Sequence, residues 1–384
     1  MARRRSASGA PTRRTVLKTL GAGALLASAA ACAPKSTSGK LYVRPYSRKP
    51  FAAPRVSMDN VIRVITGQRP YRPQGFVVRS EEMDDKLLVH NYGHGGAGIS
   101  LSWGSSALAV RETTGKKPGS VAVIGSGIMG LTSARLLQDA GWDVTIYTRD
   151  VYRHTTSNVA AGEWGPFGVH DADKSSVAFK SQLEWTARIS HHAFTNLTGR
   201  KYGIRWLEIY TLSNTLYDQY EGSESIADLY TYKGTLGPGE HPFPTTYAQH
   251  FVTMQIDPGV FLRQLTEDFQ IAGGNFVIRN FGNVSDILSL DEPVIFNCTG
   301  LGAAKLFGDE NLVPAKGQLV FMPPDPAVDY MTLDGGQGLL HMFPRSDVIL
   351  MGGIFKEGDY TTHVEDDETE RIVTEHQKLF AEFG

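Results

Sequence analysis

A glycine-rich turn between a strand and a helix constrains this chain more than any other feature of its sequence. The β-branched run 120–124 leads into the turn, residues 131–140 are good helix formers, and a second apolar strand follows at 143–147. The residues of the turn are Gly125, Ser126, Gly127, Ile128, Met129 and Gly130. The first glycine permits the tight turn, the second lets the backbone approach a pyrophosphate, and the third lets the helix pack closely on the strand. The pattern predicts a dinucleotide-binding βαβ unit with phosphates at the helix N-terminus.

The end of the second strand does not by itself choose the dinucleotide. It reads Thr148-Arg149-Asp150 instead of ending directly in an acidic residue. Asp150 fits an adenosine ribose, whereas Arg149 fits the 2′-phosphate of NADP. A surface ion pair between the two residues is the third interpretation.

The next segment resembles the second FAD-binding segment of the D-amino acid oxidase family. Three hydroxyl residues, Thr155, Thr156 and Ser157, precede the sequence Ala-Ala-Gly162-Glu163-Trp164. The resemblance implies that the hydroxyls bind the diphosphate and ribitol of FAD, and that the backbone of residues 162–164 passes the flavin. Residues 294–300 are similar to the family strand that closes over the adenosine, and we count Phe281 and Thr299 among the cofactor-binding residues.

Two further family motifs lie near the front of the chain, although in the family they follow the segment at which this chain stops. Residues 66–73, Thr-Gly-Gln-Arg-Pro-Tyr-Arg-Pro, are similar to the arginine motif. Residues 88–100 resemble the C-terminal flavin-binding motif, which here ends in Gly95, Gly96, Ala97, Gly98, Ile99 and Ser100. The resemblance therefore implies a circular permutation. A strand at 87–90, a turn at 93–98 and a helix at 99–110 would form one more βαβ crossover with the strand at Val121.

The expected fold class is α/β, with two discontinuous domains. A circularly permuted, Rossmann-like FAD-binding domain would comprise residues 85–167 and 255–312. An α+β substrate domain with a mixed or antiparallel sheet would comprise residues 41–84, 168–254 and 313–384. Domains whose chain ends lie close together tolerate such a change of order.

The resemblance implies oxidative deamination of a D-amino acid. A hydride passes from Cα to flavin N5, oxygen reoxidises the flavin to give hydrogen peroxide, and the imino acid hydrolyses to a 2-oxo acid and ammonia. Arg69 is the expected substrate anchor, because a guanidinium takes a carboxylate with two parallel hydrogen bonds. Arg72 is the competing candidate on spacing alone. Gly96 and its neighbouring glycines would bring backbone against the flavin, and His94 is expected to be structural.

One strand departs from the family pattern. His341 and Gln337 stand where the family has tyrosines that close over the substrate carboxylate, Tyr330 lies out of register, and Gly165 replaces a glutamine. His341 would either donate a hydrogen bond to a carboxylate, favouring acidic substrates if protonated, or be a solvent-facing strand residue. The alternatives are therefore oxidation of another amine of the sarcosine or glycine type, electron transfer to a quinone, or a flavin-binding envelope protein with a decayed site.

Residues 1–40 are interpreted as a targeting segment and tether. Basic residues ending in Arg13-Arg14 precede an apolar run at 19–31, and together they resemble a twin-arginine export signal. We expect export to the periplasm or cell envelope. Cys32 would either be lipidated or lie beside a simple cleavage site.

The composition limits the kinds of partner that we expect the protein to bind. The formal net charge of -2 gives no basic field for nucleic acid. The two cysteines build neither a disulfide framework nor a zinc site, and we expect no metal and no membrane span in the mature chain. The expected partners are FAD, a D-amino acid or other amine, and oxygen.

Overall fold

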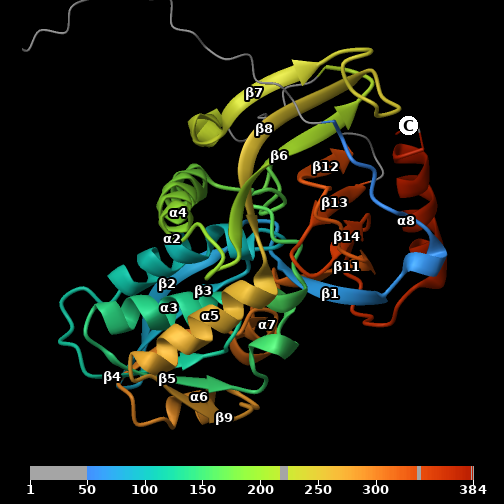
Figure 1. The fold of residues 1–384 in the computed structure, drawn as a ribbon. Helices are drawn as coiled ribbons and strands as arrows, with labels where there is room; N and C mark the ends of the chain where they lie inside the picture. The colour runs from blue at the N-terminus through green and yellow to red at the C-terminus, as the bar shows by residue number, and fades with distance from the viewer. Residues whose placement is uncertain (1–49, 217–223, 335–338, 382, 384) are drawn as a thin grey trace, which may run out of the picture. The chain divides into compact units, whose positions relative to one another are not determined.

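The structure is a computed structural model that describes residues 50–216, 224–334, 339–381 and 383. Residues 51–384 form one compact unit, separate from the unit that ends at Pro50. Two sheets organise this unit (Figure 1). The export-signal residues, Cys32 and Gln337 lie outside the described residues, so the expectations about them stay predictions. No helix of the described segments is long and apolar enough to cross a membrane.

The six-stranded sheet of the described chain has the order β2-β3-β10-β4-β5-β9. All neighbouring pairs are parallel except β2 and β3, so β2 is an antiparallel edge strand. Its strands are β2 (Val77–Met83), β3 (Lys86–Tyr92), β10 (Val294–Asn297), β4 (Ser120–Ile124), β5 (Asp143–Thr148) and β9 (Asn275–Ile278). Parallel sheets are covered on both faces, and β3 and β10 are accordingly buried at every position.

Two successive crossovers build the centre of this sheet. The strand β3 is followed by α2 (Gly98–Arg111) and β4, and β4 is followed by α3 (Ile128–Asp139) and β5. The strand β10 pairs with β3 on one side and with β4 on the other. The strand, turn and helix that the sequence predicts over residues 87–110 are therefore confirmed, and so is the glycine turn between β4 and α3.

The second sheet is mixed and has nine strands within the described residues, in the order β1-β11-β14-β13-β12-β6-β8-β7, with β15 beside β11. Only the pairing of β12 with β6 is parallel. Its strands are β1 (Arg63–Tyr71), β6 (Ile204–Ser213), β7 (Thr231–Leu236), β8 (Tyr247–Ile256), β11 (Val313–Met322), β12 (Tyr330–Asp334), β13 (His341–Pro344), β14 (Ile349–Gly352) and β15 (Lys356–Glu357). This agrees with the mixed or antiparallel sheet expected for the substrate domain.

Helices cover both sheets. In Figure 1, α2 and α3 lie against the six-stranded sheet, and α8 lies beside β11 and β14 of the other sheet. The helix α4 packs on α2, and α5 packs on α3. The helices not yet bounded are α4 (Val177–Asn196), α5 (Pro258–Ile271), α6 (Val284–Leu288), α7 (Gly302–Phe307) and α8 (Asp366–Leu379).

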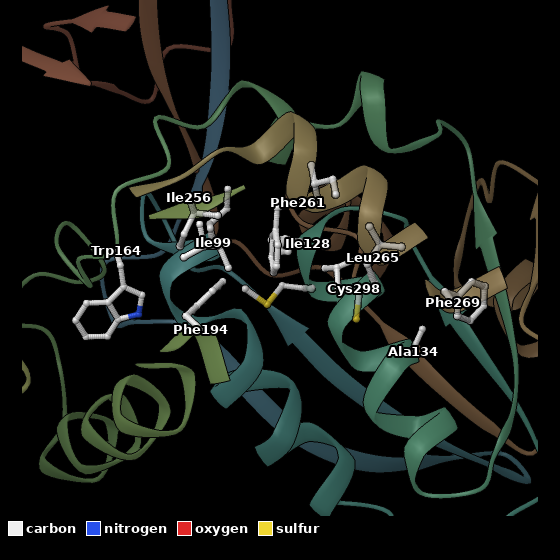
Figure 2. Packing of buried hydrophobic residues seen from close by; sticks show 14 of the residues in the cluster. Ile99, Ile128, Ala134, Trp164, Phe194, Ile256, Phe261, Leu265, Phe269 and Cys298 are labelled. Carbon is white, nitrogen blue, oxygen red and sulfur yellow. The ribbon is translucent and has the colours of Figure 1, made fainter. Parts of the chain in front are cut away.

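The largest hydrophobic cluster joins the first turns of α2 and α3 to the rest of the fold. Ile99 and Ile128, each at the start of its helix, are nearly fully buried and belong to the same cluster as Cys298 and Phe261. Figure 2 shows these side chains beside one another. Burial raises the pKa of the Cys298 thiol to about 12, so Cys298 is the buried small hydrophobe that its apolar context suggests. The packing fixes the two helix N-termini next to each other.

The structure differs from the expected domain limits at β2. The sequence analysis assigned residues 41–84 to the substrate domain, but β2 pairs along its whole length with β3 of the six-stranded sheet. The reason is the tight hairpin at Asp84, which adopts a left-handed φ of 54° and returns the chain directly along β3.

Candidate active site

A cavity of about 1280 Å³ lies where the two sheets meet, and most of the predicted site residues line it. The lining includes the glycine turn, the hydroxyl cluster, the flavin motif and the arginine motif. The predicted residues on its wall are Arg69, Gly95, Gly96, Gly98, Ile99, Ser100, Gly125, Ser126, Gly127, Ile128, Met129, Arg149, Asp150, Thr155, Thr156, Ser157, Gly162, Glu163, Phe281, Thr299 and His341. Segments far apart in the sequence thus share one cavity.

The glycine turn forms one end of the cavity. A methyl group at position 130 would lie 1.9 Å from the carbonyl oxygen of Gly125, so only glycine lets α3 pack this closely on its strand. Gly130 itself does not line the cavity, as expected of its packing role. The Ser157 hydroxyl accepts a hydrogen bond from the Ile128 amide at 3.0 Å, which ties the hydroxyl cluster to the helix N-terminus.

Two helix N-termini open into the same cavity, and neither N-cap residue caps its own helix with a side chain. The N-cap residues are Ala97 for α2 and Gly127 for α3, and neither makes a side-chain cap hydrogen bond. Helix N-termini carry exposed amides and partial positive charge, which favour phosphates and other electron-rich groups. This donor set fits a dinucleotide whose pyrophosphate lies at α3 and whose ring edge lies at α2.

At the end of β5, two interpretations left open by the sequence apply together: Arg149 and Asp150 form a surface ion pair, and both lie where a ligand could bind. Arg149 Nε and Asp150 Oδ2 are 2.6 Å apart and form an exposed ion pair. Both residues also line the cavity. The backbone carbonyl of Asp150 accepts hydrogen bonds from Ser126 Oγ and Thr148 Oγ1, so the ion pair is held next to the glycine turn.

Arg69 is an unpaired cation in the wall of the cavity. Gly96 and Gly317 leave room for it, since a methyl group at either position would lie 3.1 to 3.3 Å from guanidinium nitrogens. The Phe355 ring centroid is 5.5 Å from Arg69 Cζ, and burial lowers the pKa of Arg69. Within the described residues no carboxylate pairs with it. Buried charges normally have a partner, so we expect an anionic group of a ligand to pair with Arg69.

Arg72, the competing candidate, has a different role. Its Nε lies 3.0 Å from Asp309 Oδ2, and its Nη1 donates to the carbonyl of Gly75 at 3.1 Å. Arg72 is absent from the cavity wall. The structure therefore separates a ligand-facing arginine from a structural one, three residues apart.

His341 lines the cavity as a neutral imidazole. Its Nδ1 lies 3.0 Å from the Leu339 carbonyl, and a carbonyl only accepts, so Nδ1 carries the proton and Nε2 is an acceptor. Burial, with a smaller contribution from Arg69, lowers the pKa of His341 to about 4. The expectation of an imidazolium that donates to an acidic substrate is therefore not met at neutral pH.

His94 and Tyr330 both make contacts that support the fold, although His94 also lies on the cavity wall. Burial lowers the pKa of His94 to about 3; its Nε2 lies 2.7 Å from Ser105 Oγ, and its ring stacks on Phe76 at 4.4 Å. The Tyr330 hydroxyl donates to the Ala52 carbonyl at 2.8 Å, away from the cavity lining. Tyr330 therefore does not replace the tyrosines of the family pattern.

Besides Gly130, two predicted cofactor residues are absent from the cavity wall. Trp164 is fully buried and belongs to the main core cluster (Figure 2), and its amide donates to the Met254 carbonyl at 2.8 Å. Ala97 is also buried, in a cluster with Phe76 and Leu101. Both positions shape the wall from behind, because their backbone neighbours face the cavity.

The sequence analysis missed several lining residues. The aromatic residues Phe167, Phe251 and Phe355 lie on the wall, as does the segment 279–282 that flanks Phe281. The guanidinium of Arg279 lies 4.7 Å from the Phe281 ring centroid. No motif marks these residues, since they reach the cavity through long-range packing.

Glu163 contributes a carboxyl group that the sequence analysis treated only as part of a backbone segment. Its Oε1 is buried and has no hydrogen-bond partner in the described part of the chain. Burial raises the pKa of Glu163 to about 7. Its backbone is held firmly, because its carbonyl accepts from Ser100 Oγ at 2.9 Å and it forms a bridge with Gln255.

Comparisons with known proteins agree on the kind of protein. A family model described as FAD dependent oxidoreductase matches residues 120–384. A D-amino-acid oxidase from Streptomyces coelicolor is 29% identical over 274 residues, which cover 68% of this chain and 78% of that protein. A human D-aspartate oxidase is 25% identical over 263 residues, covering 66% and 74%. The structure of glycine oxidase from Geobacillus kaustophilus is similar with a TM-score of 0.52 at 17% identity, covering 68% and 78%.

Proposed function

This chain belongs to the family of FAD dependent oxidoreductases, and from that premise we propose that it oxidises a D-amino acid to an imino acid. The protein is an FAD-dependent enzyme of the amino acid oxidoreductase type. The chemistry supplied by bound FAD is acceptance of a hydride from the substrate Cα, followed by reoxidation with oxygen to hydrogen peroxide. Hydrolysis of the imino acid then gives a 2-oxo acid and ammonia.

The observation that carries the proposal is the guanidinium of Arg69 in the cavity, which has no carboxylate partner among the described residues. Arg69 would take the substrate carboxylate with two parallel hydrogen bonds, which fix orientation as well as affinity. The Phe355 ring next to it excludes water from one side of the guanidinium. The neutral Nε2 of His341 would accept a hydrogen bond rather than add a second positive charge.

The rest of the wall would hold the cofactor. The N-terminus of α3 and the hydroxyl of Ser157 would bind the diphosphate. Residues 95–97 and Gly98, the first residue of α2, would bring backbone and the helix N-terminus to the edge of the flavin ring. Fixed dipoles directed at a site of developing negative charge stabilise the transition state without reorganisation.

We also propose that the chain is a circular permutant of its family. The family model begins at residue 120. Residues 63–111 precede it and nevertheless supply β1 at one edge of the nine-stranded sheet and β3 in the other sheet. Both resembling motifs, with Arg69 and Gly96, lie in this preceding segment. These observations support a changed chain order around an unchanged arrangement of elements.

Export to the periplasm or cell envelope is the third part of the proposal. It is supported by Arg13-Arg14 and the apolar run that follows. Fractionation of expressing cells, with an Arg13→Lys, Arg14→Lys variant as control, would test it. The mass of the mature protein would show whether Cys32 is lipidated, cleaved off or retained.

Anaerobic reduction of the flavin is the test of the activity. The purified yellow protein is mixed with a panel of D-amino acids, with the L-isomers, glycine and sarcosine as controls. We expect bleaching of the oxidised-flavin band with D-isomers only, and loss of bleaching in Arg69→Ala. Bleaching by L-isomers or by sarcosine alone would overturn the substrate assignment, and reduction without subsequent oxygen uptake would overturn the oxidase assignment.

A further inference from the structure

Glu163 is one of three carboxyl side chains that the described residues place on the cavity wall, together with Asp334 and with Asp150 in its ion pair with Arg149. Its Oε1 is buried without a hydrogen-bond partner among them. Leaving a buried acceptor unsatisfied destabilises the fold. An arrangement that keeps such a group in a ligand cavity indicates that a ligand donor pairs with it.

The local sequence makes room for this carboxyl group. A methyl group at position 165 would lie 2.7 Å from Glu163 Oε1 and 2.5 Å from the Phe167 ring. Any side chain at Gly165 would therefore displace the carboxyl group or the ring. The Ser100 hydroxyl holds the loop in place, since it donates to the Glu163 carbonyl and accepts from the Gly165 amide at 3.1 Å.

The Glu163 carboxyl and the Arg69 guanidinium share the cavity but do not neutralise each other. No ion pair joins them within the described chain. Both groups line the cavity, so each is available to a different charged group of one ligand.

The surroundings of Glu163 favour a cation. Phe167 is on the cavity wall next to Gly165, and its ring stacks parallel to that of Tyr230 at 6.5 Å. Aromatic faces attract ammonium and guanidinium groups, most strongly when those groups are desolvated. An acidic group beside an aromatic ring is a recognition site for a basic side chain.

We infer that Glu163 is a specificity residue that selects D-amino acids with a basic side chain, such as D-lysine, D-ornithine or D-arginine. Arg69 would bind the α-carboxylate at one end of the substrate, and Glu163 would bind the side-chain cation at the other. The inference rests on the proposed function, because it names the substrate class of that same site. The cation would also favour the ionised form of Glu163, whose pKa burial raises to about 7.

The test compares D-lysine with D-norleucine, which has a similar chain without the charge. Rapid anaerobic mixing gives a reduction rate and an apparent Kd for each, so binding and chemistry are separated. In the wild type we expect D-lysine to be preferred. In Glu163→Gln the Kd for D-lysine should rise about tenfold to a hundredfold, the range of one lost charge-assisted hydrogen bond. The Kd for D-norleucine should rise far less, because this substrate has no side-chain cation to pair with Glu163.

Gly165→Ala is an independent second variant. Its methyl group would push the Glu163 carboxyl aside without removing it, so it should show the same selective loss for D-lysine. Glu310→Gln, an exposed carboxylate outside the cavity, is the matched control and should behave as wild type. Bound flavin per protein is measured for every variant, so that a folding or cofactor defect is recognised.

The outcomes separate the inference from the proposed function. Failure of every D-amino acid to reduce the flavin would sink the proposed function and the inference together. Reduction by neutral or acidic D-amino acids in preference to basic ones would overturn the inference alone. An equal loss for D-lysine and D-norleucine in Glu163→Gln would also overturn it, since Glu163 would then act on the α-amino group or the cofactor.

Discussion

Replacement by methionine should lower activity but not stability at Arg69, and stability but not activity at Arg72, three residues away. Arg69 has no carboxylate partner in the described chain, and its charge is desolvated. In Arg69→Met the fold loses an uncompensated charge, so the unfolding free energy should be unchanged or raised by about 1 kcal/mol. Substrate binding would lose two charge-assisted hydrogen bonds of about 1.5–3 kcal/mol each. The kcat/KM for D-amino acids should therefore fall roughly 10²- to 10⁴-fold.

Arg72→Met is the matched variant. The Arg72 and Asp309 side chains are only 20% and 10% exposed, so Asp309 would lose its cation in a mostly buried place. The Tyr92 hydroxyl would still donate to Asp309 at 3.0 Å. We expect a loss of about 1–3 kcal/mol in unfolding free energy, less than for a fully buried pair. The kcat/KM should stay within about twofold of the wild type.

Urea unfolding and steady-state kinetics on both variants decide the matter. Unfolding is followed with and without bound flavin, because cofactor binding raises apparent stability. The reasoning is refuted if Arg69→Met destabilises the flavin-free protein by more than Arg72→Met does. It is also refuted if Arg69→Met keeps its kcat/KM, because the unpaired cation would then have a structural partner instead of a substrate.

Three further predictions follow from the same contacts. Gly130→Ala should release flavin and lower the unfolding free energy by about 1–3 kcal/mol, because its methyl group would overlap the Gly125 carbonyl. Gly119→Ala is the control, since its methyl group would have no atom within 4 Å. It should keep its flavin and its stability in the same flavin and thermal assays. Burial lowers the folded-state pKa of His94 to about 3, below its unfolded value of about 6.5, so the unfolded state binds more protons between these two pH values. The unfolding free energy, measured by denaturant titration, should therefore fall by up to about 1.4 kcal/mol per pH unit as the pH is lowered from 6.5 toward 3. This fall should be less steep in His94→Gln. Tyr330→Phe should lose about 0.5–1.5 kcal/mol with its hydrogen bond and leave kcat/KM unchanged; a large kinetic effect would place its hydroxyl in the catalytic machinery.

Much of the nucleotide-binding region could be predicted because its signals are local. The glycine turn and the crossovers around α2 and α3 depend on short apolar strands and glycine positions that a single segment displays. Arg69 was separable from Arg72 only through the family resemblance, since spacing alone treats them alike. The structure then supplies the physical distinction, which is the presence of Asp309 beside one and of an open cavity beside the other.

The parts that could not be predicted depend on contacts between distant segments. The neutral state of His341 follows from burial, which outweighs the hydrogen bond to the Leu339 carbonyl that raises its pKa. The strand sequence reveals neither effect. The membership of β2 in the six-stranded sheet follows from a hairpin whose register is set by β3. The Glu163 carboxyl lies in the cavity because Gly165 leaves space for it, and no pattern in the sequence couples these two residues to a ligand.

The strand partners of β1 and of β3 also determine when this protein can fold. Leu87 of β3 pairs with Val294 of β10, and Arg69 of β1 lies opposite Ala315 of β11. During synthesis β3 has β2 beside it at once, but both early strands leave the ribosome long before β10 and β11 exist. Folds dominated by such distant pairings form slowly, and unpaired strand edges expose the waiting chain to aggregation. We therefore expect the substrate anchor and the flavin loop to become ordered only when the last third of the chain has been made, and cofactor loading to be a late step in maturation.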